Sequence, residues 1–130
     1  MAAMSKPALL WLDVAVVFAF VILGRRTHEE ADTISGVLRT AAPFMLGLLA
    51  GWTLTNAWRR PADLSIGFGV LAATVAIGMV LRNVVFSEGT AATFIVVASL
   101  FLALGFLGWR LAALRLSSRR KASPVAAKDS

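Results

Sequence analysis

The sequence predicts an all-α integral membrane protein, a four-helix bundle made of two helical hairpins with its N- and C-termini cytoplasmic. Of its 130 residues, 58% are hydrophobic, above the roughly 45–50% typical of soluble domains. The mean hydropathy is +0.79. The apolar residues form four long blocks, and a protein this small has too little interior to bury them away from water. Lipid is therefore the expected solvent of the chain.

Each block is expected to form one membrane-spanning helix. Its length is near the ~17–25 residues that cross a bilayer, and backbone groups in hydrocarbon must be hydrogen bonded within the segment. The alternating pattern of a membrane β-barrel strand does not occur in the sequence. Pro43 is expected in the first turns of the second helix, where proline is tolerated. The transmembrane domain covers residues 1–116, with spans at about residues 8–24, 37–58, 64–81 and 91–111.

The basic residues indicate the orientation, because cytoplasmic loops of membrane proteins are enriched in Lys and Arg. Nine basic residues fall on the side of both termini and four fall on the other side. The first group is Lys6, Arg59, Arg60, Arg110, Arg115, Arg119, Arg120, Lys121 and Lys128. The second group is Arg25, Arg26, Arg39 and Arg82. Both termini are therefore predicted to be cytoplasmic, and residues 117–130 are predicted to form a basic disordered tail near anionic headgroups.

Several short motifs follow one another along the chain. They are Asp13, 24–28 (GRRTH), 36–44 (GVLRTAAPF), 51–52 (GW), 58–61 (WRRP), 78–82 (GMVLR), 89–94 (GTAATF) and 108–110 (GWR). In this order they resemble the domain of unknown function 3054 family, small four-helix membrane proteins of bacteria and archaea, over about residues 9–112. The resemblance implies a multi-pass protein of a prokaryotic cell membrane. It implies no activity.

Small residues indicate where the helices pack, because helices in lipid associate through close backbone approach and interhelical hydrogen bonds. Gly47 and Gly51 form a GxxxG spacing on one face of the second span, and Gly69 lies among small residues of the third. Two interpretations stay open for the Gly47 and Gly51 face: packing within the bundle, or a homodimer contact.

Asp13 is the one acidic residue well inside an expected span. A charged side chain near a helix centre costs about 2.5–3.5 kcal/mol on insertion scales, so a carboxylate there is expected to face the bundle and to have a partner. Arg59, Arg60 and Arg110 lie at a compatible depth, and the candidate intramembrane polar site is Asp13, Arg59 and Arg110. Again two interpretations stay open: an ion pair that joins the first helix to the fourth or second, or a proton or cation site.

Basic residues also gather on the side opposite the termini, against the orientation rule. A convergent set of guanidinium groups there would bind phosphate, carboxylate or lipid headgroups. Four acidic residues in the same segments give the alternative interpretation, ordinary interfacial ion pairing. The candidate external anion or lipid site is Arg25, Arg26, His28, Arg39 and Arg82.

The sequence argues against several classes of function. Without cysteine there is no disulfide or thiolate metal site, and His28, the single histidine, excludes a multi-histidine metal or haem site within one chain. No catalytic motif is present, so no enzyme activity, cofactor or metal is expected. The net charge of +6 comes from residues at the ends of apolar blocks, which fits membrane topology better than nucleic-acid binding.

Two functions are favoured, and a third, a membrane enzyme that acts on an anionic lipid at the external arginine cluster, ranks last. The first is a small permease, channel or transporter component for a small polar or anionic solute, in which Asp13 and the arginines line or gate a route; four helices enclose little space, so this function needs a homo-oligomer. The alternative is a non-transporting membrane scaffold or accessory subunit that binds lipid or another membrane protein.

Overall fold

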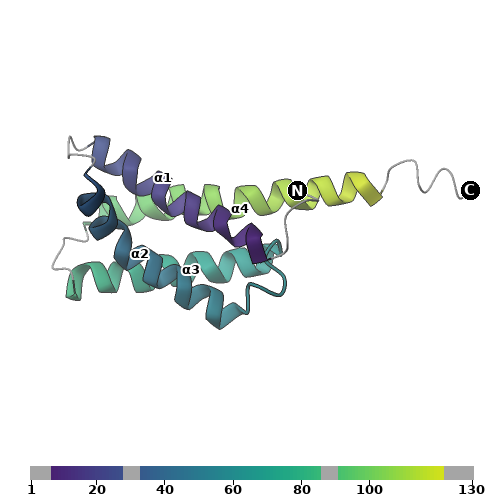
Figure 1. The fold of residues 1–130 in the computed structure, drawn as a ribbon, viewed down its shortest axis with the longest axis horizontal. Coiled ribbons are helices and arrows are strands. Elements are labelled where there is room, and N and C mark those ends of the chain that lie inside the picture. The colour runs from purple at the N-terminus through teal and green to yellow at the C-terminus, as the bar shows by residue number, and fades with distance from the viewer. Residues whose placement is uncertain (1–6, 28–32, 86–90, 122–130) are drawn as a thin grey trace, which may run out of the picture.

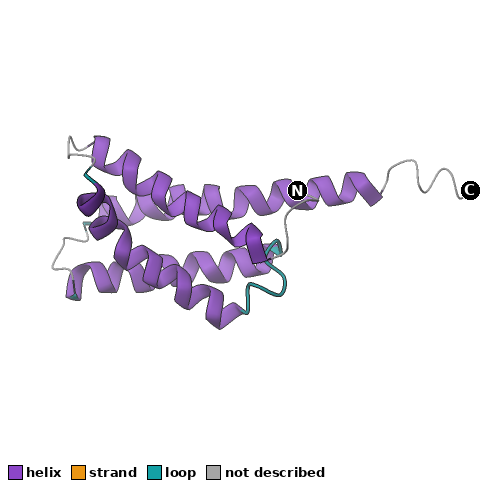
Figure 2. Cartoon of the chain, in the orientation of Figure 1, coloured by secondary structure: helices purple, strands orange, loops and turns teal. Residues whose placement is uncertain are grey.

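The structure is a computed structural model, and it describes residues 7–27, 33–85 and 91–121. A short 3-10 helix η1 (Pro7–Leu10) leads into α1 (Trp11–Thr27), and the other helices are α2 (Ile34–Thr55), α3 (Leu64–Val84) and α4 (Ala92–Lys121). Within the described residues there is no β-strand, as Figure 2 shows. The prediction of an all-α fold with four long helices is confirmed.

All four helices are long and apolar enough to cross a membrane. The qualifying segments are Pro7–Arg26, Ile34–Thr55, Leu64–Val84 and Ala92–Ser118. They hold 20 to 27 residues, or about 30–40 Å of helix, against a hydrocarbon thickness of about 30 Å. The chain is a membrane protein with four membrane-spanning helices.

The α2 helix begins and ends earlier than the sequence indicated. Thr33 caps its first turn, because the Thr33 Oγ1 accepts a hydrogen bond from the Gly36 N–H at 3.0 Å. At the other end Asn56 adopts a left-handed conformation with φ of 52° and closes the helix. Pro43 is therefore the tenth residue of the helix, and its expected place in the first turns was wrong: it removes one backbone donor from the interior of α2.

The α4 helix is also longer than expected. It has 30 residues and runs to Lys121, so residues 117–121 are helical where a disordered tail was expected. The remainder of that tail, residues 122–130, lies outside the described residues. At 1.5 Å per residue α4 is about 45 Å long, and Figure 1 shows that it extends well past the other three helices.

The helices form a closed ring in which each contacts its sequence neighbour and α1 also contacts α4. They alternate in direction, so one end of the bundle holds the start of α1, the end of α2 and the start of α3, and α4 leaves the bundle there (Figure 1). We call this the terminal end. The other end, which we call the arginine end, carries Arg25, Arg26, Arg39 and Arg82. The cytoplasmic location of the termini stays a prediction.

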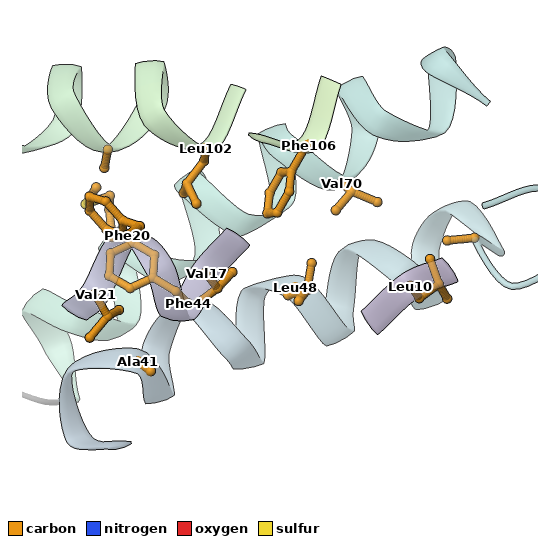
Figure 3. Packing of buried hydrophobic residues seen from close by; sticks show 13 residues of the cluster. Leu10, Val17, Phe20, Val21, Ala41, Phe44, Leu48, Val70, Leu102 and Phe106 are labelled. Atoms are coloured by element: carbon orange, nitrogen blue, oxygen red, sulfur yellow. The ribbon is translucent and has the colours of Figure 1, made fainter. Parts of the chain in front are cut away.

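The core of the bundle is apolar and aromatic. Val17 and Phe20 of α1 lie close to Phe44 of α2 in the buried cluster, and Leu102 and Phe106 of α4 belong to the same cluster, with Phe106 on the side of Val70 of α3 (Figure 3). Phe20 is central to an aromatic cluster, with ring centroids 5.6 Å from those of Phe44 and Phe101 and 5.9 Å from that of Phe94. Edge-to-face and tilted ring contacts of this kind join α1, α2 and α4.

Glycines set the spacing between α2 and α3. A Cβ atom added at Gly47 would lie 3.0 Å from the Thr74 carbonyl oxygen, and one added at Gly51 would lie 3.1 Å from the Ala73 Cβ. Gly69 faces back toward α2, where an added Cβ would lie 2.7 Å from the Thr55 methyl group. The Gly47 and Gly51 face is thus covered by α3 of the same chain, which leaves no open surface there for a second copy.

Candidate functional site

The charged centre of the bundle is an ion pair between Asp13 of α1 and Arg110 of α4. The Arg110 Nη1 donates to the Asp13 Oδ1 at 2.8 Å, and the Arg110 Nη2 donates to the Asp13 Oδ2 at 2.8 Å. This is the bidentate fork arrangement that suits a guanidinium and a carboxylate best. Both side chains have an exposed fraction of 0%, so the pair lies entirely inside the protein.

Two tryptophan indoles complete the environment of the carboxylate. The Trp52 Nε1 of α2 donates to the Asp13 Oδ2 at 3.0 Å, and the Trp109 Nε1 of α4 donates to the Asp13 Oδ1 at 2.9 Å. Each carboxylate oxygen therefore accepts two hydrogen bonds. A carboxylate offers about four acceptor positions in total, and all of them are occupied by protein donors.

The guanidinium of Arg110 is held from its other side by backbone carbonyls. Its Nε donates to the Pro61 carbonyl in the α2–α3 turn at 2.8 Å, and its Nη1 donates to the Phe106 carbonyl at 3.1 Å. The guanidinium carbon also lies 4.4 Å from the centroid of the Trp109 ring. Four of the five N–H groups of Arg110 are thus hydrogen bonded to protein acceptors, as a charge requires where water is absent.

The α3 helix contributes space to this centre. Gly67 is buried against Arg110, and a Cβ atom added at Gly67 would lie 2.7 Å from the Arg110 Cδ. A glycine is required here because any side chain would displace the arginine stem. All four helices and the α2–α3 turn therefore meet around the set formed by Asp13, Trp52, Pro61, Gly67, Trp109 and Arg110, which we call the ionic lock.

The structure brings together two of the three residues of the candidate intramembrane site. Among the described residues, Asp13 is hydrogen bonded to Arg110 and to the two tryptophans, and Arg59 does not join them. Arg59 lies exposed in the turn after α2 because the left-handed Asn56 redirects the chain there. Its neighbour Arg60 pairs instead with Asp63 at 2.9 Å on the surface.

Four parts of the ionic lock are absent from the candidate site that the sequence predicted: Trp52, Pro61, Gly67 and Trp109. The depth of Trp52 in the expected second span is a signal for a buried role. Trp109 belongs to the 108–110 motif near the end of the fourth expected span, and its indole is turned inward to Asp13. The contact with the Pro61 carbonyl and the space at Gly67 depend on how the helices cross, and no local sequence pattern predicts them.

The candidate external site lies at the arginine end. The Arg25 Nη1 donates to the Thr40 Oγ1 of α2 at 2.9 Å, and the Arg82 guanidinium stacks over the Phe94 ring of α4 at 4.2 Å. Arg26 and Arg39 are exposed. The arginines thus lie on three helix ends at one end of the bundle, while His28 lies outside the described residues.

The chemistry available at these sites is binding and structural pairing. Within the described residues no group of three or more His, Cys, Asp or Glu side chains is placed to hold a metal ion. A cavity of about 330 Å³ opens at the arginine end, lined by Phe18, Ile22, Arg26, Ile34, Val37 and Leu38. None of those residues belongs to the ionic lock.

The fold and the ionic lock define a class of protein: a small four-helix membrane protein in which a buried ion pair joins the first span to the fourth. The chain belongs to the family described as protein of unknown function (DUF3054), whose sequence pattern it matches over residues 10–113. The resemblance noted from the sequence motifs is confirmed. No curated protein and no solved structure matches the chain.

Proposed function

We propose that this protein is a non-transporting membrane scaffold or accessory subunit, in which Asp13 and Arg110 fasten the bundle and the outer helix faces bind a partner. The observation that carries the proposal is the saturation of Asp13. Its two oxygens accept four hydrogen bonds from protein donors, and its exposed fraction is 0%. A carboxylate that carries a proton or a cation along a route needs a free acceptor position and contact with water, and this one has neither.

The energetics of the pair support the same proposal. Removing one partner of a buried ion pair costs about 3–5 kcal/mol, because the other charge is left buried and unpaired. A transport pathway that opened and closed by separating Asp13 from Arg110 would cost a comparable free energy in each cycle. Two indole donors and two backbone acceptors raise this barrier further, since all of them would lose their partners together.

The surface of α4 supports a partner-binding role. Among the four candidate spans, α4 is the least covered by the rest of the chain, with 17% of its most apolar window buried against 28–33% in the others. Leu100 and Leu104 lie on its outer face with exposed fractions of 62% and 77%. The same helix continues beyond the bundle with exposed Leu111, Leu114 and Leu116. This face offers a continuous row of exposed leucines to another transmembrane helix.

The competing function is a permease or channel component, and flux through the reconstituted protein separates the two. The full chain is placed in liposomes of phosphatidylethanolamine and phosphatidylglycerol under imposed gradients of protons, sodium, chloride, phosphate and small carboxylates. We expect no flux above that of protein-free liposomes. Flux that appears with wild type and is lost in Asp13→Asn would contradict the scaffold and establish a route.

Crosslinking in native membranes tests the partner. A photoreactive amino acid at Leu104, exposed, is compared with one at Phe106, which has an exposed fraction of 0%. The scaffold predicts a discrete protein adduct from position 104, either with a second copy or with another membrane protein, and none from position 106. Only lipid adducts from position 104, together with a measured flux, would overturn the proposal.

A further inference from the structure

The net charge of the protein is concentrated at one end. Counted along the sequence, the segments at the arginine end hold four basic and four acidic residues, so their charges balance. The segments at the terminal end hold nine basic and three acidic residues, which accounts for the whole formal charge of +6. Such a bias orients a chain during insertion, and afterwards it leaves a positive field at one side of the membrane.

Two of the cations at the terminal end are paired with carboxylates of the protein. Arg110 is neutralised inside the ionic lock, and Arg60 pairs with Asp63 at 2.9 Å. Arg59 and Arg115 are exposed, and neither side chain has a hydrogen bond or an ion pair with another described residue. These two guanidinium groups are therefore open to an anion from outside the chain.

Two exposed tryptophans mark the level of the membrane surface at this end. Trp11 begins α1 with an exposed fraction of 70%, and Trp58 lies in the α2–α3 turn with an exposed fraction of 43%. Exposed tryptophan rings of membrane proteins gather at the level of the lipid headgroups. Arg59 directly follows Trp58 in the same turn. It is therefore placed in the layer that holds the lipid phosphates.

Arg115 reaches the same layer from α4. Asp13 and Arg110 are hydrogen bonded, so they share one depth. Trp11 lies two residues outward of this level and Arg115 five residues outward, a difference of about 4–5 Å, whereas the headgroup layer is about 5–8 Å thick. The helix continues to three further basic residues at 119–121, which lie within about one Debye length of that layer (Figure 1).

We propose that the terminal end binds the anionic headgroups of the adjacent leaflet, with Arg59 and Arg115 as the direct phosphate contacts. Guanidinium groups suit phosphate because their N–H donors bind it in pairs. A lipid surface is favoured over an acidic soluble partner because Arg59 lies beside an interfacial tryptophan. The inference does not rest on the scaffold function, since it uses neither a protein partner nor the outer face of α4.

The positions of the tryptophans provide the measurement. All four of them, Trp11, Trp52, Trp58 and Trp109, lie at the terminal end, so lipids at this end are the ones that quench the intrinsic fluorescence. The full chain is reconstituted in mixed bilayers in which either phosphatidylglycerol or phosphatidylcholine carries brominated acyl chains. Wild type should bind phosphatidylglycerol about fivefold more strongly than phosphatidylcholine, the effect of roughly one basic residue per headgroup.

Two matched double variants assign the preference to named residues. Arg59→Gln combined with Arg115→Gln should lower the ratio of the two binding constants below about twofold. Arg26→Gln combined with Arg39→Gln removes two exposed arginines from the arginine end and should leave the ratio unchanged. Helical circular dichroism shows that both variants are folded. Equal losses in the two variants would show a general effect of net charge and overturn the proposal, as would a wild-type ratio near one.

Discussion

The two ends of the bundle treat charge in opposite ways. At the terminal end Asp13 and Arg110 are fully buried, and every oxygen of the carboxylate is occupied. At the arginine end Arg26 and Arg39 are exposed, and Arg82 rests on an aromatic ring. Depth in the bundle decides how a charge is accommodated: one within the bundle must be neutralised by protein, and one at a helix end can also reach water and headgroups.

The largest loss of stability is expected when the ion pair at the terminal end is disrupted. Arg110→Leu leaves the Asp13 carboxylate buried without its cation and should lower the free energy of unfolding by about 3–5 kcal/mol. Reversible unfolding in mixed detergent micelles measures this. Arg59→Leu removes an exposed arginine from the neighbouring turn and should change stability by less than about 0.5 kcal/mol.

A double variant shows how much of that loss is the unpaired charge. Replacing both Asp13 and Arg110 by leucine leaves no buried ion, so it should recover most of the stability lost in Arg110→Leu. A double variant as unstable as Arg110→Leu would indicate that the other members of the ionic lock hold the bundle instead.

Removing one indole donor from the ionic lock should have the next largest effect. Trp109→Phe keeps an aromatic ring against Arg110 and deletes the donor to the Asp13 Oδ1, so the expected loss is about 1.5–3 kcal/mol, the range for hydrogen bonds to charged groups. The same unfolding measurement applies. Trp58→Phe, at an exposed residue of the turn after α2, is the matched control and should be near neutral.

Thr74 is a neutral polar group that lies between the two ends of the bundle. Thr74 is fully buried on α3, and its hydroxyl has no hydrogen-bond partner. Thr74→Val keeps the shape and removes the unsatisfied group, so it should raise stability by about 1 kcal/mol. Thr53→Val, whose hydroxyl donates to the Leu49 carbonyl, should give no gain. A loss of stability in Thr74→Val would mean that the hydroxyl makes a stabilising interaction.

The smallest effect is expected at the arginine end. Arg82→Gln removes the cation over the Phe94 ring, and the cation–π contact should account for about 0.5–1 kcal/mol of the loss in stability. A double-mutant cycle with Phe94→Leu isolates the pair. A coupling free energy as large as that between Asp13 and Arg110 would contradict the view that charge pairing stabilises the terminal end more than the arginine end.

The fold was predictable because hydrocarbon leaves the backbone few alternatives. Long apolar blocks specified the four helices, and Arg25 and Arg82 lie within the last turn of two of them. The helix ends that were predicted wrongly, at α2 and α4, depend on features other than the length of an apolar block. Thr33 starts α2 earlier than its apolar residues suggest, and Leu114 and Leu116 continue α4 as a helix past the thickness of the bilayer.

The ionic lock was only half predictable. A carboxylate inside a span must have a partner, so Asp13 and a nearby arginine could be named from sequence alone. Choosing Arg110 over Arg59 required knowing that Asn56 turns the chain outward after α2. The roles of Trp52 and Pro61 arise from helix crossing, since the first is 39 residues and the second is 49 residues from its hydrogen-bonded partner.

The separation of Asp13 and Arg110 along the chain has a consequence for biosynthesis. Arg110 follows Asp13 by 97 residues, and at about 5–20 residues per second the ribosome needs roughly 5–20 s to make that stretch. During this interval the first helix enters the translocation machinery with its carboxyl group unmatched, and Trp52 is the first donor to arrive. The ion pair can form only after α4 has been made, so a chain that stops before α4 keeps an Asp13 carboxyl group without its arginine.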